Sequence, residues 1–330
     1  MTKIEAARTE YKDWCQAVGV DTLEKVNEAL EAGKAIELIN LCEARQERKY
    51  AQAADQIYWK RNRCRIVMMS GPSSSGKTSS SLRIAQQARV LGLKPKVIEL
   101  DNYFVNRENT PIDEHGERDY EALAAMDVAF LNQQLNDLLA GKEVELPKFD
   151  FKEGHRTFTG NTLRLEDGDI LFMEGIHALN PDLTPDIPRD RIFNIYISAL
   201  SALPGGEKDH GSTTDKRLLR RIVRDNRTRG ISPEDNILRW PSVRRGEIRN
   251  IFPYEENANI VFNSSTLYDI PLLKYYAEPL LCGISESSPA YAKAQSLLHF
   301  LEIVRALKPS EIAAIPPTSI MREFIGGQTL

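Results

Sequence analysis

A run of glycine, serine, lysine and threonine residues has the spacing needed to bind a phosphate chain. It reads Gly71, Pro72, Ser73, Ser74, Ser75, Gly76, Lys77 and Thr78. The two glycines permit a close approach that side chains would block, so successive N–H groups can point at phosphate oxygens. Lys77 is expected to reach the β- and γ-phosphates of ATP, and the Thr78 hydroxyl to complete a Mg²⁺ shell. The predicted phosphate-binding residues are Gly71, Ser73, Ser74, Ser75, Gly76, Lys77, Thr78 and Ser79.

Such a loop requires a strand before it and a helix after it. Residues 66–69 form a short apolar run, and residues 79–91 have a helical composition. The start of that helix adds its positive dipole end to the phosphate site. A flexible Ser/Gly linker ahead of a helix is the alternative, but it does not explain a lysine and a threonine at this spacing after a strand.

The rest of the chain alternates short apolar runs with longer amphipathic stretches, which is the pattern of a parallel sheet with crossover helices. The expected strands are residues 66–69, 97–100, 170–173, 192–197 and 260–262. We therefore predict an α/β P-loop fold with a doubly wound five-stranded parallel sheet. Helices are expected at 130–139, 216–223 and 290–307, and a polar loop or hairpin at 147–159. Residues 318–330 carry no interpretable pattern.

The predicted division of the chain is a helical N-terminal extension, residues 1–60, followed by a P-loop kinase domain, residues 61–330. The extension lacks strand patterning and has apolar residues at helical spacing. Within the second part we expect a lid at about residues 204–232 and a C-terminal helix and tail at 285–330.

Two acidic residues follow predicted strands and could serve phosphoryl transfer. Glu174 closes the strand 170–173 and is the candidate second ligand of Mg²⁺. Asp101 closes the strand 97–100 and could accept the proton of an attacking hydroxyl. Strand ends in such sheets face the ligand crevice. Taken alone, each acid could instead be a turn or helix-capping residue.

Residues 215–229 have the spacing of a helix that carries four arginines on one stripe, while Leu218, Ile222 and Val223 lie off that stripe. Like charges so placed repel one another, and a polyanion such as ATP would relieve that repulsion. The alternative is a solvated face neutralised by nearby acids. The predicted nucleotide-binding arginines are Arg217, Arg220, Arg221 and Arg224, and for Arg220 and Arg224 we expect a catalytic role beside Asp101 and Lys77.

The bulk composition sets limits on function. The chain has 330 residues, 42% of them hydrophobic and 27% charged, with a net charge of −4. These values are typical of a soluble globular protein and argue against general binding to nucleic acids or membrane surfaces. The four cysteines form no metal-ligand spacing, no apolar run is long enough to cross a membrane, and residues 1–14 do not resemble a signal peptide. We expect a cytoplasmic location.

Other classes of P-loop protein fit the residues less well. A GTPase would need an Asn-Lys-x-Asp guanine reader, which the sequence lacks. The segment 325–328 lies too late in the chain to be a transporter-ATPase signature, and a hydrolytic motor usually has an acidic pair where Glu174 is followed by Gly175. A kinase for a small molecule agrees best with the pattern.

From about Arg65 to Asn263 the chain resembles the uridine kinase and phosphoribulokinase family, and most closely the kinase domain of long bacterial uridine kinase-like proteins. Those proteins carry tRNA-synthetase-like domains ahead of the kinase, and residues 1–60 resemble the joining segment. The resemblance rests on the phosphate loop and on four further segments, namely residues 101–104, residues 147–151 with Arg156, residues 171–176 and residues 220–225.

The resemblance implies roles for individual residues. Asp101 would be the general base for a ribose 5′-hydroxyl, Thr78 and Glu174 would organise Mg²⁺, and the arginines would belong to a lid that closes over ATP. Glu121 would hold the ribose hydroxyls. The implied acceptor-binding residues are Tyr103, Glu121, Phe149, Asp150, Phe151 and Arg156.

The sequence also departs from the uridine kinase pattern on the acceptor side. Gly154 stands where a base-reading histidine is usual, Tyr103 precedes Phe104 in reversed order, and Ile231 replaces a second lid arginine. We therefore predict an ATP-dependent kinase acting on a nucleoside such as uridine or cytidine. A phosphoribulokinase-like enzyme for sugar phosphates and a nucleotide-switched regulatory or RNA-associated module remain the alternatives. A homo-oligomer is compatible with the sequence.

Overall fold

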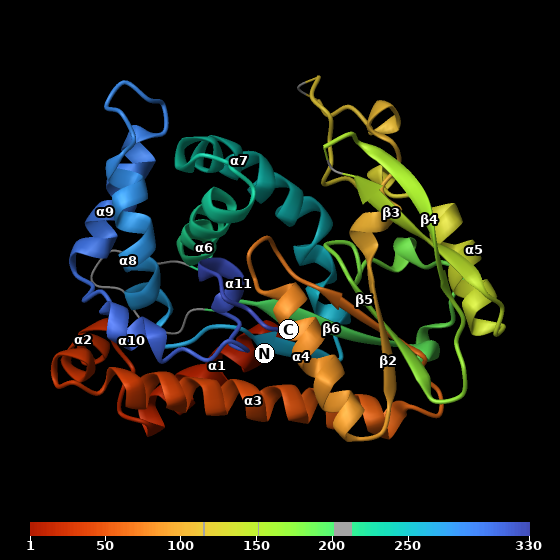
Figure 1. Cartoon of the computed structure of the whole chain (residues 1–330), viewed down its shortest axis with the longest axis horizontal. Helices are drawn as coiled ribbons and strands as arrows, with labels where there is room; N and C mark the ends of the chain where they lie inside the picture. Colours follow the sequence, from red (N-terminus) through yellow and green to blue (C-terminus); the bar gives the residue numbers. More distant parts are fainter. Residues whose placement is uncertain (115, 151, 201–212) are drawn as a thin grey trace.

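Five parallel strands form the central sheet, in the order β2-β5-β1-β6-β7 (Figure 1). The computed structural model describes residues 1–114, 116–150, 152–200 and 213–330. The prediction of a doubly wound five-stranded parallel sheet is confirmed. The strands are β1 (Ile66–Ser70), β2 (Lys94–Glu99), β5 (Asp169–Glu174), β6 (Ile192–Ser198) and β7 (Ile260–Asn263).

The inner strands of the sheet are buried on both faces, which explains why β1, β5 and β6 are largely apolar runs, whereas the edge strand β2 alternates between buried and exposed residues. In β1, every residue is buried. Val67 and Met69 face a core that they share with helices α3 (Ala35–Lys60) and α4 (Lys77–Val90). Ile66 and Met68 face the opposite core, to which helix α5 (Val128–Leu139) contributes. The sheet is thus held between two helical layers.

The helices surround the sheet and rise above its carboxyl edge on two sides (Figure 1). Helices α6 and α7 lie on the upper side of that view, and α8 and α9 form the outer left flank. The remaining helices are α1 (Lys3–Ala17), α2 (Leu23–Glu31), α6 (Thr213–Thr228), α7 (Pro233–Asn250), α8 (Asp269–Cys282), α9 (Tyr291–Glu302), α10 (Pro309–Ala313) and α11 (Arg322–Ile325).

The N-terminal residues form the expected helices α1, α2 and α3. Thr2 and Thr22 cap the first two, each accepting a backbone N–H from three residues further on. Helix α3 packs along α4, where Arg83 and Gln87 bond to the carboxylate of Glu47. Helix α3 therefore supports α4, the helix that follows the phosphate loop. A domain boundary near residue 60 stays a prediction.

An antiparallel hairpin, β3 (Val144–Asp150) and β4 (His155–Leu163), stands at the right of Figure 1 beside α5. Of the two predicted possibilities for residues 147–159, a polar loop or a hairpin, the structure has the hairpin. Phe151 lies outside the described residues, as does the first part of the predicted lid, residues 204–212; the rest of that predicted lid is α6 and the turn after it.

The C-terminal end carries structure where the sequence offered no pattern. Helix α11 returns to the centre of the molecule and lies close to α4 and α6 (Figure 1). Ile320, Met321 and Phe324 of this segment are buried in the core. Among the helices that the structure describes, none combines the length and apolar character needed to span a membrane.

Candidate phosphoryl-transfer site

The phosphate loop connects β1 to α4, as the sequence predicted. It turns through positive φ angles of 58° at Ser74 and 85° at Gly76. A Cβ at Gly71 would overlap the carbonyl of Ile197, and one at Gly76 would overlap the side chain of Ile320. The loop therefore needs glycine at both positions, because its backbone lies directly against neighbouring atoms.

Lys77 and the first turn of α4 carry the donors that suit an anion. The Lys77 ammonium donates to the carbonyls of Gly71 and Pro72, at 2.9 and 3.4 Å, and so lies folded over the loop. The N–H groups at the start of a helix have no partner within the helix. Together with the lysine they make the loop a site for phosphate oxygens.

A hydroxyl and a carboxylate meet beside the loop in the arrangement expected for Mg²⁺. Thr78 Oγ1 donates to Glu174 Oε1 at 2.7 Å, which joins the start of α4 to the end of β5. Burial raises the pKa of Glu174 to about 7, although Lys77 and the Thr78 bond act in the opposite direction. A divalent cation would favour the ionised carboxylate, so this donor pair fits the ion.

Within the described ranges, no three His, Cys, Asp or Glu side chains gather closely enough to hold a metal by themselves. Mg²⁺ sites in kinases commonly take one or two protein oxygens and complete their shell with water and substrate phosphates. Thr78 and Glu174 would supply the protein oxygens.

Asp101 is the second residue of a short 3-10 turn, Leu100–Tyr103, that follows β2 at the carboxyl edge of the sheet. Its residue surface is open to the cleft, but many protein atoms surround the carboxylate. This partial desolvation raises its pKa, while Lys77 and Arg229 act in the opposite direction. An aspartate that is readily protonated and reachable from the cleft has the properties of a general base.

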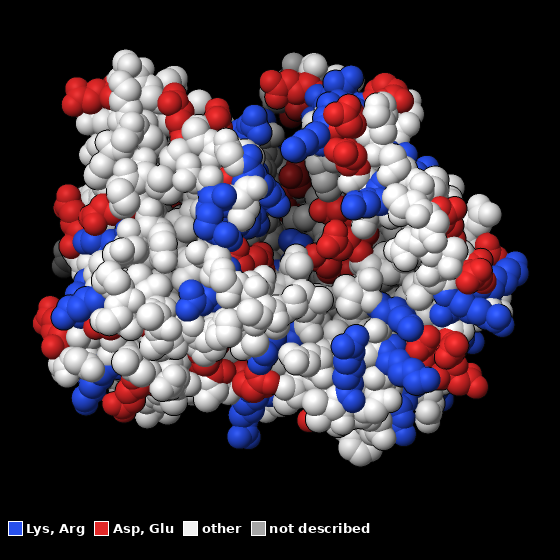
Figure 2. Space-filling view, viewed as in Figure 1, with Lys and Arg blue, Asp and Glu red and all other residues white. Residues whose placement is uncertain are grey.

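The phosphate loop, Asp101 and Glu174 share one cleft of roughly 270 Å³. The charged residues that line it comprise five acids and four bases. Figure 2 shows Lys and Arg gathered to the left of a central hollow, and Asp and Glu to its right. The acids are Asp101, Glu121, Glu174, Glu247 and Glu323, and the bases are Lys77, Arg221, Arg224 and Arg229.

The four predicted arginines of α6 divide into two pairs. Arg221 and Arg224 line the cleft, and Arg221 Nη1 donates to Ser73 Oγ at 2.8 Å. The buried carboxylate of Asp225 gathers Arg221, Arg224 and Arg229, at 3.4, 2.8 and 3.5 Å. Asp225 therefore positions the guanidinium groups that face the site.

Arg217 and Arg220 lie elsewhere, with 1% and 0% of their side chains exposed. Arg217 forms two bonds to the carboxylate of Glu247 and donates to the Ser73 carbonyl at 3.0 Å. It supports the loop from behind. The helical stripe seen in the sequence is thus not one ligand-facing surface, because the core covers half of it.

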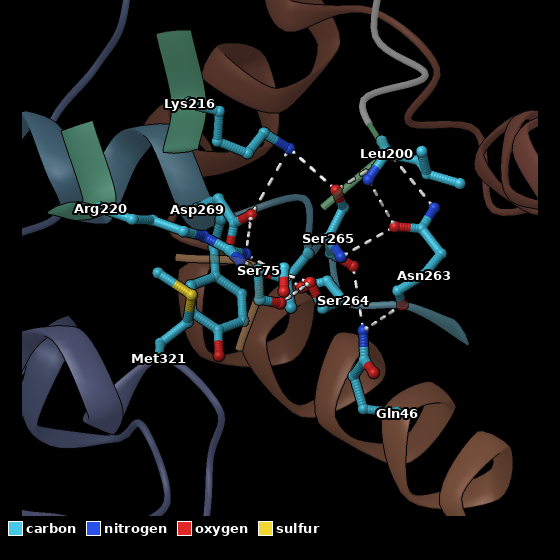
Figure 3. Close-up of polar contacts among 12 residues, drawn as sticks. Gln46, Ser75, Leu200, Lys216, Arg220, Asn263, Ser264, Ser265, Asp269 and Met321 are labelled. Carbon is cyan, nitrogen blue, oxygen red and sulfur yellow. Dashed lines mark hydrogen bonds and ion pairs between the residues drawn. The ribbon is translucent and has the colours of Figure 1, made fainter. Parts of the chain in front are cut away.

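Arg220 belongs to a buried polar network behind the phosphate loop (Figure 3). It donates to Asp269 at 2.7 Å and to the carbonyl of Ser264 at 2.9 Å. The Ser264 hydroxyl in turn donates to the Ser75 carbonyl at 2.5 Å. Lys216 joins the same carboxylate at 3.4 Å. The network fixes the loop to α6 and α8.

The predicted acceptor residues are dispersed. Glu121 lines the cleft, and burial raises its pKa to about 7. Tyr103 is 1% exposed and donates to Gln134 Oε1 at 2.8 Å, which makes it a core residue.

Phe149, Asp150 and Arg156 lie in the hairpin, and Phe151 lies outside the described residues. The Phe149 ring packs on Phe104. Asp150 accepts the N–H groups of the turn that follows it. Arg156 pairs with Asp127 at 2.8 Å and lies over the ring of Phe130. Arg156 therefore braces the hairpin against α5.

Three lining residues carried no usable signal in the sequence. Glu247 of α7 accepts the Ser73 N–H at 3.1 Å, and Glu323 of α11 accepts the Ser79 N–H at 3.3 Å. Arg229 directly follows α6, and its positive charge lowers the pKa of Asp101, against the effect of burial. Arg229 lies after the end of α6 and off the helical stripe of the other arginines, and the two glutamates come from segments without a motif.

Comparisons with known proteins place the chain in a family. Residues 66–200 match the model of the phosphoribulokinase/uridine kinase family. A uridine kinase from Macrococcus caseolyticus is 31% identical over 59% of this chain and 86% of its own length. One from Streptococcus equi subsp. zooepidemicus is 30% identical over 54% and 76%.

The chain belongs to the phosphoribulokinase/uridine kinase family. Membership implies a P-loop kinase that uses ATP and acts on a small molecule. Among solved structures, a possible uridine kinase from Bacillus stearothermophilus matches with a TM-score of 0.39 and 20% identity, over 61% of this chain and 89% of that one.

Proposed function

We propose that this protein transfers the γ-phosphoryl group of ATP to the 5′-hydroxyl of a nucleoside, with uridine and cytidine as the model acceptors. The observation that carries the proposal is the position of Asp101, which shares one cleft with the phosphate loop and the Thr78–Glu174 pair. A kinase needs these three parts within reach of one another, because transfer depends on positioning and charge stabilisation.

Each part has a distinct task in the proposed reaction. The loop amides and Lys77 bind the phosphate chain, and Mg²⁺ held by Thr78 and Glu174 would neutralise its charge. Asp101 accepts the proton of the attacking hydroxyl. Arg221 and Arg224, oriented by Asp225, stabilise the charge that develops on the transferred group.

The charge of the cleft favours an acceptor without a phosphate group. Its described lining has five acids and four bases, and ATP adds further negative charge. The positive charge of Arg229 already lowers the pKa of Asp101, and that of Arg221 lowers the pKa of Glu121, against the larger effect of burial. An acceptor phosphate beside these acids would be repelled. Hydroxyl groups, by contrast, can donate to Asp101 and Glu121, as ribose would.

The experiment is an acceptor screen with the purified 330-residue chain, in which ATP consumption is coupled to a spectroscopic readout. Uridine, cytidine, ribulose 5-phosphate and pantothenate are the test acceptors. We expect turnover that requires Mg²⁺ and a nucleoside, with product carrying a 5′-phosphate. Turnover with ribulose 5-phosphate alone would favour the sugar-phosphate alternative. ATP binding without any acceptor-dependent turnover would refute the proposal and favour a regulatory module.

A further inference from the structure

The C-terminal segment places a carboxylate on the start of α4, beside the phosphate loop. Glu323 Oε2 accepts from both the N–H and the hydroxyl of Ser79, at 3.3 and 2.5 Å. Gln328 Nε2 donates to the same hydroxyl at 2.7 Å. Ser79 is the third residue of α4, so its N–H is one of the donors that a helix start offers to an anion.

Two further contacts show that the segment is held in this position. The Ile320 side chain lies directly against Gly76 of the loop. The Arg227 guanidinium of α6 lies against Gly326, and donates weakly to the carbonyls of Phe324 and Glu323 at 3.4 and 3.5 Å. Since Ile320 is buried, its side chain anchors the segment, whereas the Glu323 side chain reaches outward into the cleft.

We propose that Glu323 is an internal competitor for the part of the nucleotide site that receives the α-phosphate. The inference rests on the proposed function, because it assumes that ATP binds along this loop. A carboxylate oxygen and a phosphate oxygen cannot both accept the Ser79 N–H in the same geometry. Two anions at one helix start also repel each other. ATP must therefore displace the Glu323 side chain, and the displacement lowers its apparent affinity.

The surrounding charges agree with an anion held at this point. The negative charge of Glu323 contributes to the raised pKa of Glu174. The same charge favours the protonated form of Arg229. Replacing Glu323 by a neutral residue would change the described lining from five acids to four, equal to its four bases. The site would then accept a polyanion more readily.

The test compares the wild type with Glu323→Gln and Glu323→Ala, using titration calorimetry with Mg²⁺–ATP and with Mg²⁺–tripolyphosphate. Glutamine keeps the shape of the side chain and removes its charge. We expect both variants to bind both ligands about three- to tenfold more tightly than the wild type. Glu302→Gln, which changes an exposed acid that pairs with His299, is the matched control and is expected to bind like the wild type.

Tripolyphosphate separates two roles for Glu323, because it lacks the base and the ribose. Equal or weaker binding of both ligands in the variants would overturn the inference. So would weaker binding of ATP with unchanged binding of tripolyphosphate, since Glu323 would then contact the nucleoside part. Failure of every protein to bind either ligand would instead refute the proposed function itself.

Hydrogen exchange gives a readout that does not depend on affinity. The N–H of Thr329 donates to the Pro317 carbonyl at 3.1 Å, so its exchange reports on the order of the C-terminal segment. If ATP displaces Glu323, exchange in residues 323–329 is expected to accelerate when ATP is added to the wild type. Slower exchange there would show that the tail closes on the nucleotide, and would overturn the inference.

Discussion

Removing the carboxylate of Asp269 should destabilise the protein strongly, because this one acid partners two buried cations. Arg220 and Asp269 both have 0% of their side chains exposed, and Lys216 has 5%. Burial alone would raise the pKa of Asp269, but Arg220 and Lys216 outweigh that effect and lower it. The carboxylate is therefore ionised in the native state. In Asp269→Asn, two positive charges lose their partner in the core.

Breaking a buried ion pair by removing one partner typically costs about 3 to 5 kcal/mol. For a chain of 330 residues, an unfolding entropy of about 0.7 kcal/mol/K converts this to a fall in Tm of about 4 to 7 °C. The matched control is Asp137→Asn, which breaks an exposed pair with Lys142. It is expected to change stability by less than about 0.5 kcal/mol.

The loss of stability in Asp269→Asn should also be smaller at high pH than at neutral pH. Burial already lowers the pKa of Lys216, and Asp269 acts against that shift. Without Asp269 the folded-state pKa falls further below the unfolded value, so the native state of the variant gains stability as pH rises between the two. Urea unfolding at pH 7 and pH 9 should therefore show a smaller loss at pH 9.

The reasoning would be refuted by a loss below about 1 kcal/mol at pH 7. The sequence pattern suggested another role for Arg220, in which it contacts the transferred phosphoryl group. That role predicts that Arg220→Lys lowers kcat while the free energy of unfolding stays unchanged. The buried network predicts the opposite: in Arg220→Lys the free energy of unfolding falls, while kcat of the folded protein changes little.

Two further predictions concern the acids and the metal site. Glu121→Gln should raise the free energy of unfolding at pH 8 by about 1 to 3 kcal/mol, and change it little at pH 4.5. The sign follows because the folded-state pKa of Glu121, about 7, lies above its usual 4.5, so the native state loses stability as pH rises through that window. Urea unfolding at both pH values checks this, and an equal effect at both would contradict it. Thr78→Val should weaken binding of Mg²⁺–ATP at least about tenfold. Titration in EDTA is the control, because binding of metal-free ATP should change less; equal losses in both would argue against a metal ligand at Thr78.

The sequence predicted those features that depend on neighbouring residues. The strand before the phosphate loop, the helix after it and the acid at the end of β5 are each encoded within a few positions. Apolar runs predicted the inner strands because the core covers both of their faces, so those runs are nearly unbroken. The edge strand β2 alternates between buried and exposed residues and begins at Lys94, three residues before the predicted start. Glu174 and Asp101 were found because parallel strands bring their carboxyl ends to the same edge.

Partners that are distant in the chain could not be predicted. The helical repeat places Arg217 and Arg220 beside Arg221, but it cannot say which side of the helix the core covers. The partner of Arg220 lies 49 residues away, and Ser79 and Glu323 are 244 residues apart. Tyr103 and Arg156 were assigned to the acceptor by resemblance, whereas in the fold they contact Gln134 and Asp127.

The central claim is that Asp101 takes the proton of an alcohol while the phosphate loop holds ATP. The most direct measurement is a single turnover of ATP with uridine, followed by ³¹P NMR, in the wild type and in Asp101→Asn. The account predicts a 5′-phosphate product in the wild type, and a rate about 10²- to 10⁴-fold lower in the variant, which should bind ATP normally. Full activity in Asp101→Asn would contradict it.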